Sequence, residues 1–260
     1  MSVKNEKCIL LIPMVCVLLL MAGSALYSLD VTFSINTDQD NATISPWIYG
    51  TNQLLTDTEN WTVRRVGGNR TTGYNWENNA SNAGADWEHS SDNFMCTNMG
   101  VPASDYETPG AVYTVARDAD IAKGRATVLT LQMAGYAARD KNGTVTEAEA
   151  APSARWVQTI ARKGSVFSLS PNTGDAYVYM DELVNFLVNR YGSASGNNGV
   201  RFYCMDNEPA LWSSTHPRIH PSAAGCVEVR DKTIALAKAV KDVDSAAQTV
   251  GPVLYGFAAF

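Results

Sequence analysis

The segment 206-DNEP-209 directly follows the mostly apolar run 200-VRFYCM-205, so two carboxylates and an amide come where a buried strand is expected to meet solvent. Carboxylates seldom occupy such a position without a partner or a task. Glu208 could protonate the leaving oxygen of a glycosidic bond, and Asn207 could donate a hydrogen bond to a sugar hydroxyl. Pro209 would restrict the backbone of Glu208 and so the direction of its carboxyl. The alternative is a glutamate that only caps the loop after the strand.

Flat rings and amides alternate in the segment 69-NRTTGYNWENNASNAGADWEH-89. Glucosyl units present apolar C–H faces, on which rings stack, and equatorial hydroxyls, which amides bind. The segment is therefore a candidate carbohydrate-binding surface. The side chains that would contact the sugar are Arg70, Tyr74, Asn75, Trp76, Asn78, Asn79 and Trp87. The alternative is a self-capped, asparagine-rich turn over buried tryptophan rings.

Cysteine and histidine spacings give no metal site. Cys96, Cys204 and Cys226 lie far apart, so at most one disulfide could form among them, and no spacing resembles that of zinc ligands. His216 and His220 lie in a loop broken by prolines, where the helical geometry that would bring both rings to one metal ion is not expected. Orientation or packing roles are therefore favoured for both histidines.

The charge balance and the first residues limit the partners and the compartment. The formal net charge is -6 and no basic run occurs, which argues against nucleic acid and gives no reason to expect binding to an anionic membrane surface. Lysines precede the apolar run 8-CILLIPMVCVLLLMAG-23, and the small residues Ser24 and Ala25 follow. This order is typical of a secretory signal peptide, here residues 1–25, and the run is short for a membrane span. An uncleaved anchor is the alternative.

Hydrophobic periodicity predicts the elements that must position these residues. Strands are expected at 29–35, at 47–53 with an end at Gly50, and at 62–68, 126–133, 200–205 and 249–257; helices are expected at 111–123, 177–191 and 227–243. Apolar strands that alternate with amphipathic helices indicate an α/β fold with a parallel sheet. Five such strands, counted from Ile48, fit an eight-stranded (β/α)8 barrel that is truncated after its fifth strand. A nucleotide-binding open sheet is disfavoured because 67-GGN-69 lacks the glycine spacing of that fold.

Three segments together resemble glycoside hydrolase family 44: 64-RRVGGNRTTGYNWENNASNAGADWEHSSDNF-94, 206-DNEPALWSSTHPRIHP-221 and 251-GPVLYGFAAF-260. The resemblance runs from about Val31 to the last residue. It implies a secreted endo-β-1,4-glucanase, with some members also acting on xyloglucan, built as a TIM barrel beside a β-sandwich. Residues 1–25 would then be the signal peptide, 29–46 a strand segment of the accessory sandwich, and 47–260 a partial barrel.

The resemblance also assigns roles. Glu208 takes the place of the general acid/base at the end of the fourth barrel strand, and the strand count from Ile48 independently makes 200–205 the fourth. The further candidate substrate contacts are Asn52, Asn207, Trp212, His216 and Tyr255. The expected partner is a β-glucan polysaccharide, with no nucleic acid and no membrane after signal removal, and the protein is expected to be a monomer. No cofactor is expected for catalysis; the family carries structural calcium, for which Glu77, Asp86 and Asp92 are candidate ligands.

One departure concerns the nucleophile, which in the family is a glutamate at the end of the seventh strand. A retaining enzyme needs two carboxyls about 5–5.5 Å apart, so an N-terminal fragment without that glutamate is not expected to be competent. Glu147 and Glu149 are expected in a polar loop and Glu182 on the outer face of a helix, which leaves Glu77 as the internal candidate. A non-catalytic carbohydrate-binding protein is the alternative function, and the preference for cellulose or xyloglucan stays open.

Overall fold

The structure is a computed structural model of the 260-residue chain, and it describes residues 31–39, 41–52 and 60–256. The chain divides into two units, residues 1–43 and 44–260. The predicted signal peptide lies outside the described residues. No helix in the described part is both long and apolar enough to cross a membrane.

In the first unit, the described residues 31–36 have no regular secondary structure. The side chains of Val31, Phe33 and Ile35 are exposed, which is the alternating apolar set that predicts a strand over 29–35. A strand needs a neighbour to bind its backbone N–H and carbonyl groups, and no described residue of this unit supplies one. The strand prediction is therefore corrected for the residues that the structure describes.

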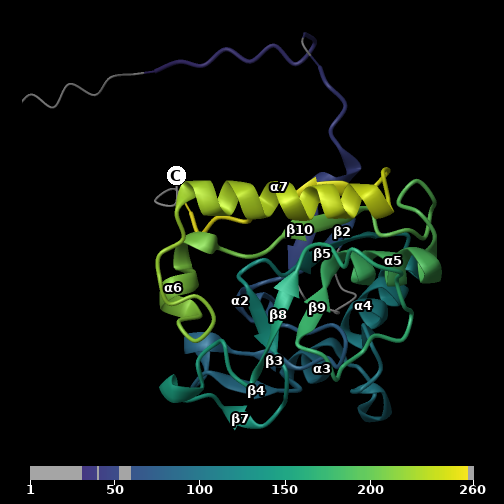
Figure 1. Ribbon diagram of the computed structural model, residues 1–260. Coiled ribbons are helices and arrows are strands. Elements are labelled where there is room, and N and C mark those ends of the chain that lie inside the picture. Colours follow the sequence, from purple (N-terminus) through teal and green to yellow (C-terminus); the bar gives the residue numbers. More distant parts are fainter. Residues whose placement is uncertain (1–30, 40, 53–59, 257–260) are drawn as a thin grey trace, which may run out of the picture. The chain divides into compact units, whose positions relative to one another are not determined.

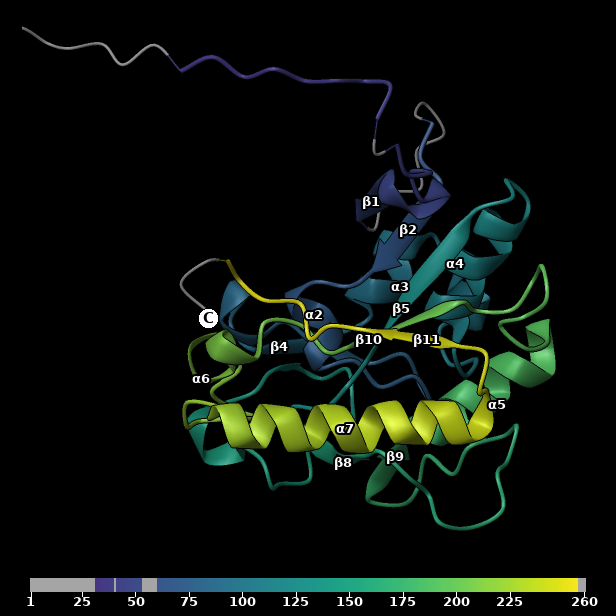
Figure 2. The ribbon, with the colours of Figure 1, turned by 90° about the horizontal axis from the view of Figure 1, so that it is seen from above.

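The second unit is built around a five-stranded parallel sheet (Figures 1 and 2). Its strands lie in the order β1-β2-β5-β10-β11, which is also their order along the chain. They are β1 (Gly50–Asn52), β2 (Val63–Val66), β5 (Ala126–Leu131), β10 (Phe202–Met205) and β11 (Gln248–Val250). A doubly wound open sheet reverses its strand order, and this sheet does not. The α/β class with a parallel sheet is confirmed.

The strand predicted at 47–53 begins later than expected. Residues Pro46–Ile48 form the 3₁₀ turn η1, with the Ser45 hydroxyl accepting from the Trp47 N–H at 3.2 Å, and β1 starts at Gly50 instead of ending there. Proline at the first position of a helical turn favours the turn, because its fixed φ suits the turn and its missing N–H is not needed there.

The long helices of the described part are α4 (Ala111–Ile121), α5 (Met180–Tyr191) and α7 (Cys226–Val243). Helix α4 packs on β2 and β5, and α7 packs on β10 and α5; Figure 2 shows α7 running along the sheet. The apolar stripe that predicts α5 is buried, with Met180, Leu183 and Leu187 on the covered face. Gly192, at φ 83°, ends this helix and donates its N–H to the Val188 carbonyl.

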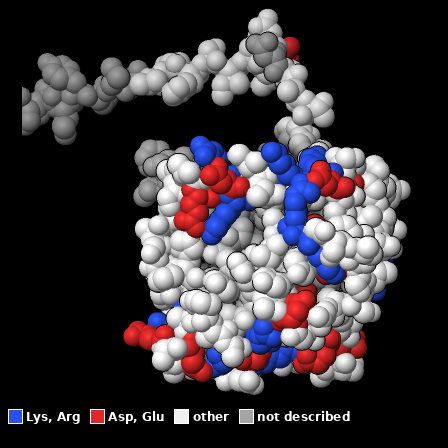
Figure 3. All heavy atoms as spheres, in the orientation of Figure 1, with Lys and Arg blue, Asp and Glu red and all other residues white. Residues whose placement is uncertain are grey.

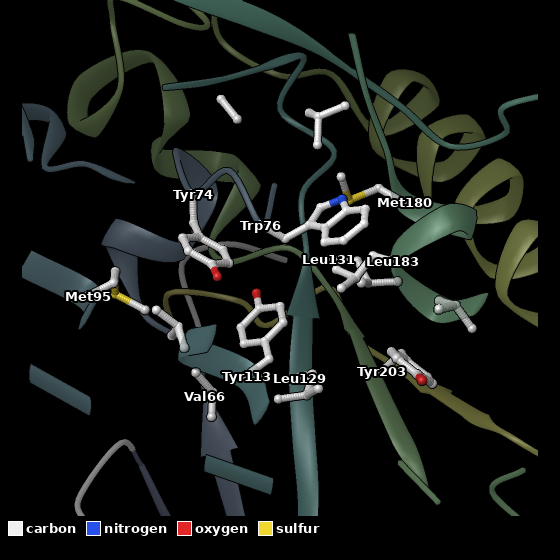
Figure 4. Packing of buried hydrophobic residues seen from close by; sticks show 14 of the residues in the cluster. Val66, Tyr74, Trp76, Met95, Tyr113, Leu129, Leu131, Met180, Leu183 and Tyr203 are labelled. Carbon is white, nitrogen blue, oxygen red and sulfur yellow. The ribbon is translucent and has the colours of Figure 1, made fainter. Parts of the chain in front are cut away.

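Aromatic rings pack among aliphatic and methionine side chains in the hydrophobic core (Figure 4). The rings of Tyr74 and Tyr113 lie 5.0 Å apart, and the ring of Trp76 lies 5.6 Å from that of Phe186. Tyr113 also donates its hydroxyl to the carbonyl of Thr130 in β5. Two of these rings come from the segment 69–89, so that segment is part of the core.

Two small sheets and several short helices were not predicted. The sheets are β3 (Ser81–Asn82), β4 (Ser90–Asp92) and β7 (Gly143–Thr144), and β6 (Tyr136–Ala138), β8 (Trp156–Ile160) and β9 (Tyr177–Tyr179). The short helices are α2 (Asn69–Thr72), η2 (Gly84–Asp86), α3 (Phe94–Met99), η3 (Ala103–Asp105), η4 (Glu147–Glu149), η5 (Pro209–Leu211) and α6 (Trp212–Thr215). Together they turn the expected long loops into packed structure.

On the face in Figure 3, charges of both signs are interspersed.

Candidate active site

The segment 206–208 lies at the edge of the sheet where the carboxyl ends of the parallel strands meet. Pairing continues past the end of β10, since Asn207 forms a parallel bridge with Val253 and the Glu208 N–H donates to the Val253 carbonyl at 2.7 Å. Functional residues of parallel α/β folds come from this edge. Glu208 is half-buried there.

The backbone around Glu208 is strained. Asp206 and Glu208 both adopt left-handed backbone conformations, with φ of 59° and 46°. Such conformations cost on the order of 1–3 kcal/mol for residues other than glycine, and residues before proline usually prefer extended ones. The carbonyl of Glu208 accepts the Leu211 N–H at 2.8 Å, within the 3₁₀ turn that begins at Pro209. Strain of this kind persists only where the surrounding contacts impose it, so the direction of the Glu208 side chain is set by its neighbours.

Asp206 anchors this edge from within the core. Its carboxylate accepts four hydrogen bonds: from the N–H groups of Met133 (2.7 Å), Ala134 (3.0 Å) and Asn207 (2.7 Å), and from the Thr72 hydroxyl (2.7 Å). Burial raises the pKa of Asp206, and the four donors partly offset this rise. The loop after β5 is thereby tied to the loop after β10. Sequence reasoning missed this role, although an acid directly after a buried strand was the available signal.

Asn207 lies between a cation and Glu208. Arg65 donates from Nη2 to Asn207 Oδ1 at 2.8 Å, and Asn207 Nδ2 donates to Glu208 Oε2 at 3.0 Å. Arg65 Nη1 also lies 3.5 Å from Asn52 Oδ1. The predicted residues Asn52 and Asn207 are thus joined by a cation that sequence reasoning missed. The signal for Arg65 in the sequence was the pair of adjacent arginines in β2. Because side chains alternate along a strand, the two arginines must face opposite sides of the sheet.

Two of the three rings predicted to stack on sugar are buried. Tyr74 and Trp76 are each 0% exposed. Tyr74 donates its hydroxyl to Asn79 Oδ1 at 2.7 Å, and Trp76 Nε1 donates to the Tyr179 carbonyl at 3.2 Å. Because a stacking platform needs an accessible face, the prediction of sugar contact is corrected for both rings. The alternative of a packed turn over buried rings applies to them.

The asparagines of the same segment hold the chain. Asn75, Asn78 and Asn79 each donate from Nδ2 to a main-chain carbonyl, at 3.0, 2.8 and 2.6 Å. Asn75 and Asn78 also accept the N–H two residues ahead, both at 3.0 Å, which is the local bonding typical of turns. Asn75 and Asn79 are buried and are corrected to structural residues. Asn78 is half-buried, and its sugar contact stays a prediction.

Trp87 differs from the other two rings because it is 66% exposed. It lines a hollow of about 520 Å³ together with Arg70, Phe94, Asp92 and three further residues, Asn69, Ala83 and Asp86. Arg70 pairs with Asp92, and its guanidinium carbon lies 4.4 Å from the centre of the Phe94 ring. Because Trp87 is exposed beside carboxylates and an amide, it stays a predicted sugar contact, and so does the half-buried Arg70, which lines the same hollow. Asn52 and Tyr255 are also exposed and stay predictions.

Trp212 and His216 are buried and do not present free faces to a sugar. Trp212 is 0% exposed, and its Nε1 donates to the Asn207 carbonyl at 3.0 Å, so it holds the main chain beside Glu208. His216 is 1% exposed, with Nε2 2.8 Å from the Asn69 carbonyl, which fixes the ring proton on Nε2. Burial lowers the pKa of His216 to about 4. Direct substrate contact is corrected for both residues.

Glu77, the internal candidate for the nucleophile, is 3% exposed and lies among other acids. Its pKa is raised to about 8, first by burial and then by the charges of Asp175 and Glu182, while the charge of Lys163 opposes this rise. The side chain of Glu208 accepts a hydrogen bond from Asn207, and Asn207 is not among the groups that shift the pKa of Glu77. The contacts therefore give no support for Glu77 as the second carboxylate.

Glu182 was expected on the outer face of α5, and this expectation is wrong. Its side chain is 1% exposed, pairs with the Lys163 ammonium and accepts the Ser168 N–H at 2.6 Å. The segment between β8 and β9 covers this face of the helix, which periodicity alone does not reveal. Glu147 and Glu149 do lie in a polar turn, η4, as expected.

The candidate calcium ligands do not fit a metal site. Asp92 is paired with Arg70, Asp86 accepts from Asn69 Nδ2 at 2.7 Å, and Glu77 lies in its own acidic cluster. Calcium takes six to eight oxygen ligands around one point. Across residues 31–39, 41–52 and 60–256, no group of three or more His, Cys, Asp or Glu side chains could hold a metal ion. Cys96, Cys204 and Cys226 are free thiols.

Comparison with known proteins points to a glycoside hydrolase. The model of glycoside hydrolase family 44 matches residues 80–260. Endoglucanase A of Paenibacillus lautus is 59% identical over 231 residues, and β-mannanase/endoglucanase A of Caldicellulosiruptor saccharolyticus is 47% identical over 227 residues. The chain belongs to glycoside hydrolase family 44.

Solved structures agree with this assignment. A family 44 xyloglucanase of Paenibacillus polymyxa, solved with xyloglucan, is 57% identical with a TM-score of 0.82, and a family 44 endoglucanase of Clostridium thermocellum is 55% identical with a TM-score of 0.81. Each match covers 84% of this chain and 42% of the solved one. The matches to the two curated relatives cover 89% and 87% of this chain. They cover only 33% and 17% of the relatives' own length.

Proposed function

We propose that the chain is part of an endo-acting glycoside hydrolase that cleaves β-1,4-glucan of the cellulose or xyloglucan type. The observation that carries the proposal is the glutamate at the carboxyl edge of the parallel sheet, half-buried and bound by an amide that a cation holds. Relatives named endoglucanase and xyloglucanase support the substrate class. The substrate would meet Glu208 and, elsewhere on the surface, the exposed or half-buried Trp87, Asn52, Asn78 and Tyr255, whereas Asn207 is 4% exposed and would position Glu208.

The proposed architecture is a (β/α)8 barrel of which this chain supplies the first five strands. The parallel sheet in chain order supports this proposal, since a barrel adds each strand beside the last. Residues 29–46 would belong to an accessory β-sandwich. A crystal structure of the complete catalytic domain tests both statements, and an open sheet with β11 at a free edge would refute the first.

The proposed mechanism is retaining double displacement. Glu208 protonates the glycosidic oxygen as the bond to the anomeric carbon breaks, while a second carboxylate attacks that carbon and forms a glycosyl-enzyme. Glu208, now ionised, then takes a proton from water, which attacks the anomeric carbon and releases the carboxylate. The product keeps the β configuration, and no metal or cofactor takes part in these steps.

The second carboxylate is proposed to come from the part of the family fold that this chain does not span. The solved relatives are more than twice as long as the matched region, which leaves room for it. In a barrel, the loops after later strands would reach the same carboxyl-end edge of the sheet as Glu208. We therefore expect the 260 residues alone to lack hydrolytic activity, and a chain that also carries the remainder of the catalytic domain to be active.

The test is Glu208→Gln in that complete enzyme. Glutamine keeps the shape but has no carboxyl proton to give, so hydrolysis of unactivated glucan should fall by about 10²–10⁴-fold, the share usual for general acid–base catalysis. Aryl glycosides with good leaving groups need little protonation, so their glycosylation should suffer far less. Azide should then speed their turnover, because it attacks the glycosyl-enzyme without a general base.

Glu147→Gln is the matched control, since this glutamate is on an exposed 3₁₀ turn with 87% of its side chain accessible. It should hydrolyse glucan at the rate of the unmodified enzyme. Near-normal hydrolysis by Glu208→Gln would mean that Glu208 only caps its loop. Retained glucan binding by a complete chain that never hydrolyses would favour a carbohydrate-binding protein instead.

Export is proposed from the first 25 residues, whose lysines, apolar run and small residues have the order of a signal peptide. Secretion fits a polysaccharide substrate, which is too large to enter a cell. N-terminal sequencing of protein from the culture medium should find a start between Leu26 and Leu29. Recovery of a form with intact Met1 only in the membrane fraction would contradict this prediction.

A further inference from the structure

We infer that Arg65 is a positioning residue for the proton donor: acting through Asn207, it decides which oxygen of Glu208 carries the proton. The inference rests on the proposed function of Glu208. It starts from two hydrogen bonds in series, Arg65 Nη2 to Asn207 Oδ1 at 2.8 Å and Asn207 Nδ2 to Glu208 Oε2 at 3.0 Å.

Strand β2 delivers the cation to this point. Successive side chains of a strand point to opposite faces, so the side chains of the adjacent Arg64 and Arg65 lie on opposite sides of the sheet. Arg64 faces helix α4, where its Nη2 pairs with Asp120 Oδ1 at 2.7 Å. Arg65 faces the other side of the sheet, beside Asn52, its register partner in β1, and reaches Asn207 at the end of β10.

The chemistry of the donor fixes the orientation of the amide. A guanidinium only donates hydrogen bonds, so the oxygen of the Asn207 amide must face Arg65. The NH₂ group of the same amide then faces Glu208, and this group also only donates. Glu208 Oε2 is thereby kept as an acceptor. When Glu208 is protonated, its proton therefore sits on Oε1, the oxygen that is free to point at a leaving group.

Arg65 is the contact that discriminates between the two amide orientations. The backbone of Asn207 is fixed from both sides, by its N–H to Asp206 Oδ1 (2.7 Å) and by Trp212 Nε1 to its carbonyl (3.0 Å). These bonds leave a rotation of the amide by half a turn open. Without the cation, the rotated amide would present its oxygen to Glu208, draw the proton onto Oε2 and leave Oε1 unable to donate.

The experiment uses the complete enzyme and compares Arg65→Met with Arg65→Lys. We expect Arg65→Met to lower kcat on unactivated β-glucan by about 10–100-fold, less than loss of the acid itself, with little change in KM. Among aryl cellobiosides, its rate should depend more steeply on the leaving group, because protonation has become less efficient. Arg65→Lys should lose about 3–10-fold, since an ammonium also only donates but reaches Asn207 in a less fixed direction.

A double-variant cycle asks whether Arg65 acts through Asn207. If it does, Arg65→Met should add nothing to the loss caused by Asn207→Ala, whereas independent effects would multiply. Arg190→Met, on an exposed ion pair with Asp118, is the control and should match the unmodified enzyme in rate and in leaving-group dependence. Melting temperatures of all variants separate lost positioning from lost folding.

An unchanged leaving-group dependence in Arg65→Met, or losses that multiply in the double variant, would overturn the inference. If Arg65→Met does not fold, Arg65→Lys is read alone, and a rate on unactivated glucan equal to that of the unmodified enzyme then overturns the inference. Glu208→Gln is run alongside: if that variant hydrolyses glucan normally, the proposed function fails. If it is inactive while Arg65→Met is normal, only the role of Arg65 fails.

Discussion

Trp76 and Trp87 come from one segment of the sequence, yet the structure gives them opposite roles, and alanine at each position separates these roles. Trp76 is 0% exposed, packs against Phe186 and donates its indole N–H to the Tyr179 carbonyl at 3.2 Å. Trp87 is 66% exposed beside the hollow of about 520 Å³. Trp76→Ala should therefore lower stability, and Trp87→Ala should lower glucan binding.

The magnitudes follow from these contacts. Removing a buried tryptophan side chain costs about 3–5 kcal/mol, and the Tyr179 carbonyl left without its donor adds about 1 kcal/mol. For a domain of roughly 200 residues, each kcal/mol lowers the melting temperature by about 2–4 °C, so Trp76→Ala should melt on the order of 10–20 °C lower. Trp87→Ala should change the unfolding free energy by less than about 0.5 kcal/mol. Loss of one stacking face, about 1 kcal/mol, should weaken glucan binding about fivefold.

The assay pairs thermal unfolding, followed by circular dichroism, with titration of soluble β-glucan at a temperature where both variants are folded. Each variant serves as the control for the other, because both lose an indole from the same segment. The reasoning is refuted if Trp76→Ala melts with the unmodified protein while binding glucan more weakly, since that result would make Trp76 an accessible platform.

Two further predictions concern buried charge. Arg64→Met should destabilise the protein by about 3–5 kcal/mol in urea unfolding, because Asp120 would be left buried without its partner, whereas the exposed Arg190→Met should cost at most about 1 kcal/mol; equal losses would contradict this reasoning. Burial lowers the pKa of His216 to about 4 from 6.5, so at acid pH the unfolded chain binds a proton that the folded chain does not. Stability should thus fall as pH drops through this window, by about 2 kcal/mol from pH 7 to pH 5, and His216→Gln should lack this part of the loss.

Hydrophobic periodicity predicts those elements whose secondary structure is set by the burial of an apolar face. Helix α5 and strands β5 and β10 carry long apolar patterns, and each lies within a few residues of its expected range. The sheet of β3, β4 and β7 carries no such pattern. Its strands have two or three mostly polar residues, such as Ser81–Asn82, and Ser90 of β4 pairs with Thr144 of β7, which lies far away in the chain. Only tertiary contacts specify such strands.

The residues of the candidate site likewise fall into those that local sequence predicts and those that depend on distant partners. Glu208 and Asn207 were predictable because they directly follow a buried strand, and position along one strand is local information. Arg65 and Asp206 were not, because their partners come from distant segments: Asp206 binds the N–H of Met133, and Arg65 reaches across from β2. The rings of the segment 69–89 have similar types and spacing, so the sequence does not reveal which of them turns outward.

The proposed role of Glu208 as a proton donor would account for its place between an amide and a proline. Fixing a glutamate side chain costs up to about 2 kcal/mol of rotamer freedom, and a donor left to rotate would meet the leaving oxygen only part of the time. Here the backbone is held by Val253 and by the turn at Pro209, and one carboxyl oxygen is held by Asn207. The cation behind Asn207 comes from the same strand that sends Arg64 to the opposite face, where it binds helix α4. Because side chains alternate along β2, Arg64 binds helix α4 within the fold, and Arg65 faces Asn207, through which it would direct the proposed acid.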